Sequence, residues 1–115
     1  MLIIEAHIKT FKLDDVREAL DDLGVAGVTV TEVMQMGDPK ARGRTFGGRG
    51  GMPLDLVPKI KLEIAVQKEI AARVIEAICL YGSTGKTEDG NIVVERLEST
   101  IRIRTGEFDE AALSR

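Results

Sequence analysis

The feature that most constrains the fold is a strand–helix–strand succession that occurs twice within 115 residues. Each copy begins with a segment in which apolar and polar side chains alternate, LIIEAHIK and PKIKLEIAV, as in strands with one buried face. An apolar stripe of helical period and a β-branched segment follow each time. Two such units predict a ferredoxin-like α+β domain, with two helices on one face of an antiparallel sheet. The predicted strands are residues 2–9, 27–33, 58–66 and 92–97, and the predicted helices are residues 12–24 and 68–81.

Two further elements are expected toward the C-terminus. Residues 100–105 (TIRIRT) predict a short fifth strand, and residues 106–115 predict a final helical turn. Because the predicted sheet has helices on one face only, Ile3 and Ala65 are left among charged residues on its uncovered face. A half-apolar uncovered face usually meets another subunit or a ligand, so we expect this chain to self-associate.

The composition limits the class of protein. Hydrophobic residues make up 43% and charged residues 30%, which is typical of one globular domain, residues 1–115. Aromatic residues make up only 3%, which disfavours a base-stacking platform, so no nucleic-acid partner is expected. The net charge of −3 means that any anion site is local. No apolar run is long enough to span a bilayer and no signal peptide is evident, so we expect a cytoplasmic protein without direct membrane insertion.

The sequence contains no catalytic or metal-binding constellation. His7 is the only histidine and Cys79 the only cysteine, so neither a Ser-His-Asp set nor a cluster of His and Cys ligands is predicted. Cys79 follows Ile78 on an apolar helical segment and is expected to be a buried structural thiol. His7 is expected to be a packed or hydrogen-bonded strand residue, with contact to a ligand as the alternative. These observations indicate a binding protein rather than an enzyme.

Three features indicate anion binding, and each has a plainer alternative. Residues 83–91 (STGKTEDGN) can turn backbone N–H groups toward phosphate oxygens, or can form only a polar turn. Arg102 and Arg104 are two apart on the expected strand, so their guanidinium groups point the same way, toward a polyphosphate or into solvent. The glycine-rich stretch 37–51 is long for a plain connection, which favours a functional loop over flexible filler. Its four cations are Lys40, Arg42, Arg44 and Arg49.

Four separated segments, in the right order, resemble the PII signal-transduction proteins. They are residues 9–33, 56–66, 84–94 (TGKTEDGNIVV) and 101–107 (IRIRTGE), and the resemblance covers nearly the whole chain. It implies a ferredoxin-like homotrimer that binds an adenine nucleotide, ADP, AMP or ATP, in each cleft between subunits. It also implies a B-loop at about 82–91, a C-terminal segment at about 100–115, and a T-loop at about 37–58. The T-loop would contact an unknown target enzyme or membrane transporter.

The resemblance assigns site residues position by position. Nucleotide contacts are expected in an adenosine pocket, in the B-loop and from an arginine pair of a neighbouring subunit. These residues are Thr29, Gly37, Glu63 and Ala65 in the pocket, Thr84, Gly85, Lys86, Glu88, Asp89, Gly90 and Asn91 in the B-loop, and Arg102 and Arg104 in the pair. Partner or effector contacts are expected from Asp38, Pro39, Lys40, Arg42, Arg44, Phe46 and Arg49. No residue is assigned to catalysis or to a metal.

The chain departs from the family pattern where the outer phosphates and 2-oxoglutarate are held. Asp38 stands where the family has an arginine, Pro39 where it has a glutamine, and Asn91 where it has a lysine. A carboxylate repels phosphate, and proline has neither a side-chain amide nor a backbone N–H. We therefore expect ADP or AMP to bind at least as well as ATP, and 2-oxoglutarate to bind weakly or not at all.

The T-loop region also lacks a tyrosine, since Tyr81 is the only one in the chain, so regulation by uridylylation is not expected. PII-like proteins of inorganic-carbon metabolism have altered loops, which makes bicarbonate near Arg42, Arg44 or Arg49 a candidate effector. Two alternatives stay open. One is a classical nitrogen-regulatory PII protein that binds ATP and 2-oxoglutarate, and the other is a ferredoxin-like trimer with weak ATPase activity or a metal-related role.

Overall fold

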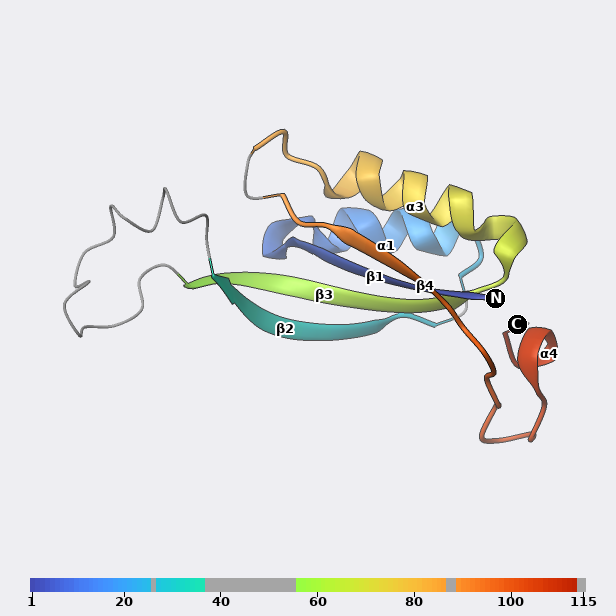
Figure 1. Cartoon of the computed structure of the whole chain (residues 1–115). Helices are drawn as coiled ribbons and strands as arrows, with labels where there is room; N and C mark the ends of the chain where they lie inside the picture. The colour runs from blue at the N-terminus through green and yellow to red at the C-terminus, as the bar shows by residue number, and fades with distance from the viewer. Residues whose placement is uncertain (26, 37–55, 87–88, 114–115) are drawn as a thin grey trace.

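The computed structural model describes residues 1–25, 27–36, 56–86 and 89–113. Four strands form one antiparallel sheet in the order β2-β3-β1-β4, and helices α1 and α3 lie together on one face of it (Figure 1). This is the predicted ferredoxin-like α+β arrangement. The elements are β1 (Leu2–Lys9), the 3-10 helix η1 (Thr10–Lys12), α1 (Leu13–Asp22), β2 (Thr29–Met36), β3 (Leu56–Val66), α3 (Lys68–Gly82), β4 (Ile92–Arg96) and α4 (Asp109–Leu113).

The alternation in β1 and β3 produces the core. Ile4 and Ile64 are directly opposite each other in the β1–β3 ladder, and both are fully buried. Val16 and Leu20 of α1 and Val74 of α3 supply the facing layer. Burying a side chain of this size contributes roughly 1.5–3 kcal/mol. The strand alternation and the helical stripes therefore agree on which face of the sheet is covered.

The residues of β1 that alternate with the core positions lie on the other face of the sheet. Ile3, Glu5 and His7 are each partly buried on it, while α1 and α3 both lie on the opposite side (Figure 1). None of the helices in the described ranges is long and apolar enough to cross a membrane.

The segment expected as a fifth strand, residues 100–105, does not form one. Ile101 makes an isolated bridge to Phe108, and residues 103–105 form a turn. The backbone N–H of Arg102 donates to the carbonyl of Glu107 at 2.8 Å, so the segment folds back on itself instead of joining the sheet. The expected final helical turn forms as α4.

Cys79 is exposed, so the expectation of a buried thiol is wrong. It follows the buried Ile78, and one residue along a helix turns the side chain by about 100° from its predecessor.

Two strands are also longer than predicted. β2 continues to Met36, and β3 begins at Leu56, so the last three residues of the expected T-loop belong to a strand.

Candidate functional site

The turn between α3 and β4 is organised around the carboxylate of Asp89. This carboxylate accepts the backbone N–H groups of Thr84 and Gly85, each at 2.9 Å, and the Thr84 hydroxyl at 2.6 Å. The Ser83 hydroxyl also donates to it, at 3.3 Å. Gly85 has a φ of +76°, a conformation that glycine adopts without strain. The hydroxyl and N–H donors of Thr84 hold the pKa of the Asp89 carboxyl well below its ordinary value of 3.8.

Lys9 connects this turn to the sheet. Its ammonium group donates to Thr84 Oγ1 at 3.0 Å and lies 3.4 Å from Asp89 Oδ1. Lys9 is the last residue of β1, and its side chain is only 17% exposed. Hydrogen bonds to charged groups are stronger than neutral ones, and partial burial reduces the screening by water. The end of β1 therefore holds the turn in position.

Gly90 approaches the backbone of β1 more closely than a side chain would allow. A Cβ atom at this position would lie 2.1 Å from the carbonyl oxygen of His7 and 2.9 Å from its carbonyl carbon. The next residue, Asn91, accepts the N–H of His7 through its backbone carbonyl at 3.2 Å. The requirement for glycine here comes from this close approach.

Asp89 occupies N–H groups that the sequence predicted for a phosphate. The N–H groups of Thr84 and Gly85 donate to Asp89, and that of Lys86 donates to Thr84 Oγ1 at 3.3 Å. The N–H groups of Gly90 and Asn91 and the side chain of Lys86 make no hydrogen bond within the described part of the chain. In the described part of the turn, these three groups remain available to an external anion.

The expected adenosine-pocket residues Thr29, Glu63 and Ala65 lie in the two strands β2 and β3. Thr29 is directly opposite Glu63, and Glu63 is also directly opposite Glu5 of β1. The ammonium group of Lys61 lies 3.2 Å from Glu5 and 3.8 Å from Glu63. Its hydrogen bond to Glu5 raises the pKa of Lys61 above the ordinary value of 10.5, so this lysine stays a cation at neutral pH.

A second lysine accompanies Lys9 at its end of the sheet. Lys59 is directly opposite Lys9 in the β1–β3 ladder and is only 2% exposed. Like charges directly opposite each other on neighbouring strands repel, so a nearby anion stabilises this pair. Asp89 is one such anion, because it lies within ion-pair distance of Lys9.

Arg102 and Arg104 have different environments, which corrects the expectation that they point the same way from a strand. Arg102 Nη2 donates to the carbonyl of Ala112 in α4 at 2.9 Å, and its Nη1 lies 3.8 Å from the Glu107 carboxylate. Arg104 is exposed in the turn 103–105. The reason for the difference is that the segment folds back on itself, so the strand periodicity does not apply.

The Asp89 turn and the Arg102 segment lie at opposite ends of the sheet (Figure 1). Lys9, at the end of β1, contacts the turn, whereas the N–H of Leu97, just after β4, donates to the carbonyl of Met1 at the other end. One chain therefore does not bring Arg102 to the Asp89 turn. A site that uses both must be formed by two copies of the chain.

Sequence reasoning missed Lys9 and Glu107 as members of these clusters, and it placed Ser83 in the B-loop without naming it as a contact. The alternation of β1 places Lys9 on the uncovered face, and this is a usable signal. An aspartate in a glycine-containing turn commonly accepts nearby backbone N–H groups, which is the signal for the arrangement around Asp89. Nothing in the local pattern around Arg102 indicates its contact with Glu107.

The remaining predicted contacts lie outside the described residues. They are Gly37, Glu88, Asp38, Pro39, Lys40, Arg42, Arg44, Phe46 and Arg49. Within the described ranges, no group of three or more His, Cys, Asp and Glu residues is placed to hold a metal ion.

Comparison with known proteins identifies the family. The family model "Nitrogen regulatory protein P-II" matches residues 1–107. The chain is 49% identical over 110 residues to the Nitrogen regulatory protein P-II of Haemophilus influenzae, covering 96% of this chain and 97% of the relative. It is 46% identical over 110 residues to the Nitrogen regulatory protein P-II 1 of Escherichia coli K12, with the same coverage. It is 45% identical over 113 residues to the Nitrogen regulatory protein P-II of Rhizobium etli, covering 98% of this chain and 100% of the relative.

The matches extend over both the sheet and the Asp89 turn, and the relatives are named as regulators rather than enzymes. This chain belongs to the nitrogen regulatory protein P-II family of signal-transduction regulators.

Proposed function

We propose that this PII regulator is a cytoplasmic homotrimer that binds an adenine nucleotide in each cleft between subunits. The observation that carries the proposal is the separation of Arg102 from the Asp89 turn within one chain. The turn between α3 and β4, which contains Asp89, lies at one end of the sheet, and the segment between β4 and α4, which contains Arg102, lies at the other (Figure 1), so a site that uses both requires a neighbouring subunit. The half-apolar uncovered face, where Ile3 and Ala65 are directly opposite each other, is a suitable surface for that neighbour.

The proposed output is a T-loop that responds to the nucleotide and contacts a target enzyme or membrane transporter. Its two ends leave the sheet at Met36 and Leu56, which are directly opposite each other in the β2–β3 ladder. A nucleotide shifts such a loop between two states only by the difference in its affinity for them. Ordering a glycine-rich loop has a high entropic cost, which makes the balance between two states easy to tune.

The donors near Asp89 favour nucleotides with few phosphates. Asn91 carries no positive charge, and a carboxylate at Asp38 would repel an outer phosphate. Because Asp89 already uses the N–H groups of Thr84 and Gly85, few donors remain for a long phosphate chain. We therefore expect ADP or AMP to bind at least as tightly as ATP, and 2-oxoglutarate to bind weakly or not at all.

Isothermal titration of the purified protein with ATP, ADP and AMP, each with and without Mg²⁺, tests this preference. The expected result is a Kd for ADP or AMP equal to or below that for ATP, without added heat from 2-oxoglutarate. Strong 2-oxoglutarate binding that depends on Mg-ATP would contradict the preference while leaving nucleotide binding intact. If none of the three nucleotides binds, the proposal itself is wrong.

The same titration distinguishes a second candidate, a classical nitrogen-regulatory PII protein that binds ATP and 2-oxoglutarate. Two observations favour it: the names of the relatives, and the lysine pair Lys9 and Lys59, which places two cations at one end of the uncovered face. A repeat in bicarbonate buffer tests the proposed bicarbonate effect, and unchanged nucleotide affinity would remove it. Phosphate release from ATP measures any weak ATPase activity.

Arg102→Ala is expected to weaken nucleotide binding by about ten- to a hundredfold, because a charged hydrogen bond to phosphate is lost. Arg102 also contacts Ala112, so its loss can disturb α4. Arg104→Ala is the companion variant, since Arg104 makes no hydrogen bond or ion pair within the described ranges, and it is expected to weaken binding without lowering the melting temperature. Arg17→Ala, on the exposed face of α1, is the control. If Arg102→Ala and Arg104→Ala bind the nucleotide as tightly as the Arg17→Ala control, the arginine pair is excluded from the site.

A further inference from the structure

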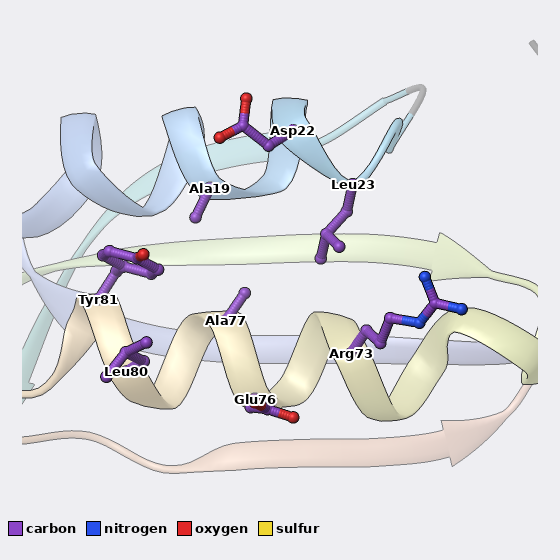
Figure 2. A pocket seen from close by; sticks show the side chains of 8 residues that line it. All are labelled: Ala19, Asp22, Leu23, Arg73, Glu76, Ala77, Leu80 and Tyr81. Carbon is purple, nitrogen blue, oxygen red and sulfur yellow. The ribbon is translucent and has the colours of Figure 1, made fainter.

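A hollow of about 360 Å³ lies between α1 and α3 on the outside of the helical layer. Figure 2 shows Ala19 and Ala77 at the facing sides of the two helices, with Leu23 and Tyr81 pointing into the space between them. Two alanines at the line of contact are too short to fill the space between the helices, and this leaves the hollow. We call this hollow and its rim the α1–α3 groove.

The α1–α3 groove has exposed apolar side chains at one end. Leu80 is 67% exposed and Tyr81 is 45% exposed, and both line the hollow. Single exposed apolar residues are ordinary, but here two large ones adjoin a concave surface. The groove therefore offers apolar contact area together with a shape that receives a ridge of side chains.

The rim of the groove is acidic. Asp15, Glu18 and Asp22 follow one another along one face of α1, spaced three and four residues apart, and line an adjoining hollow with Tyr81. Glu76 lies on the opposite margin, on α3 (Figure 2). These four carboxylates and Arg73 make no hydrogen bond or ion pair within the described part of the chain. The rim thus has four unpaired negative charges and one positive charge.

We propose that the α1–α3 groove binds a basic amphipathic helix of a partner protein. A helix laid in a groove contacts it through apolar side chains at positions i, i+3 or i+4, and i+7, and lysine or arginine beside that stripe would meet the acidic rim. A second copy of this chain is a poor occupant, because a symmetric contact would bring one acidic rim against another. The surface is distinct from the T-loop. It also lies on the face of the molecule opposite the proposed trimer contact (Figure 1), so it stays accessible in the assembly.

The test uses a labelled helical peptide of about 16 residues, with leucine at i, i+3, i+7 and lysine on both sides of this stripe. Fluorescence anisotropy with the full-length protein measures its Kd, and a scrambled peptide of equal composition controls for non-specific attraction. Asp22→Asn with Glu76→Gln is expected to weaken binding about fivefold, since two exposed ion pairs are lost. Leu80→Ser is expected to weaken it by a similar factor through lost apolar contact.

The matched control is Asp21→Asn with Glu69→Gln, which makes the same change in net charge on the same two helices outside the groove. It is expected to leave the peptide affinity within twofold of the wild-type value. The proposal is overturned if both double variants weaken binding equally, or if the scrambled peptide binds as tightly as the striped one. It is also overturned if sedimentation shows that Leu80→Ser changes the oligomeric state, since the occupant is then a second copy. Circular dichroism and melting of each variant confirm that loss of binding is not loss of fold.

Discussion

Asp89→Asn is expected to weaken adenine-nucleotide binding by about tenfold or more, because the carboxylate that organises the turn loses its charge and one of its acceptor oxygens. The asparagine oxygen can still accept an N–H group of Thr84 or Gly85. Its amide nitrogen, however, would face the Thr84 hydroxyl, which donates to Asp89 in the native turn, and the Lys9 ammonium, which donates to Thr84. The turn is then no longer preformed, and the nucleotide must order it. Isothermal titration with ADP measures the loss.

The same variant tests the titration of Asp89. Its folded pKa lies below the ordinary 3.8, so its contribution to stability is fully present above the unfolded pKa and is lost as the pH falls through the folded pKa. The difference in melting temperature between wild type and Asp89→Asn is therefore expected to be constant from about pH 8 to pH 5 and to narrow below about pH 4. Asp21→Asn, an exposed change on α1, serves as the control. If the difference does not narrow in acid, the ionised Asp89 does not hold the turn.

Gly90→Ala is expected to cause the largest loss of stability of any single change in the turn. The new Cβ would lie 2.1 Å from the carbonyl oxygen of His7. The Cβ position is fixed by the backbone of residue 90 and the His7 carbonyl is main chain, so no side-chain rotation relieves the clash. Relief of the clash requires the turn to move away from β1, which breaks the His7 N–H contact to Asn91. We expect a loss of about 3 kcal/mol in the free energy of unfolding, which lowers the melting temperature by roughly 10 °C.

Two other glycines serve as graded controls for Gly90→Ala. Gly27 has no atom within 4 Å of an added Cβ and no positive φ, so Gly27→Ala is expected to leave the melting temperature nearly unchanged. Gly85 has open space but a φ of +76°, so Gly85→Ala is expected to cost about 1–2 kcal/mol from backbone strain alone. All variants are compared at one protein concentration, since assembly contributes to apparent stability. A melting temperature for Gly90→Ala as high as that for Gly27→Ala would refute the close approach.

The sheet and its buried face follow from local pattern. Successive side chains of a strand point to opposite faces of the sheet. The alternation in β1 and β3 therefore predicted that Ile4 and Ile64 are buried and that Glu5 and Glu63 are not. The apolar stripes of the helices predicted less exactly which residues at their edges are buried. Cys79 is adjacent to a buried position, and adjacent helical residues point in directions about 100° apart.

The turn between α3 and β4 was predicted by location but not by internal arrangement. A turn rich in Gly, Ser and Thr indicates many N–H donors, and the structure has them. Which anion accepts those N–H groups depends on Asp89 and on Lys9. Lys9 donates to Thr84, which lies 75 residues away from it in sequence. Likewise, residues 100–105 (TIRIRT) alternate apolar and polar side chains as a strand does. A strand also needs a neighbour, however, and the N–H of Arg102 donates to the carbonyl of Glu107 within the same segment. Such contacts depend on the tertiary fold, which local periodicity does not describe.

In the proposed trimer, each nucleotide site takes its Asp89 turn from one subunit and its Arg102 from another. This arrangement is tested by co-expression of differently tagged Arg102→Ala and Asp89→Asn chains, followed by purification of the mixed trimers. Each variant alone has a defect in every site, whereas a mixed trimer of either composition combines an intact turn with an intact arginine in one of its three sites, about one third of the total. Titration with ADP is therefore predicted to recover about that fraction of tight sites in the mixed trimers. If mixing recovers no tight site beyond those of the two separate variants, the turn and the arginine do not act across a subunit boundary.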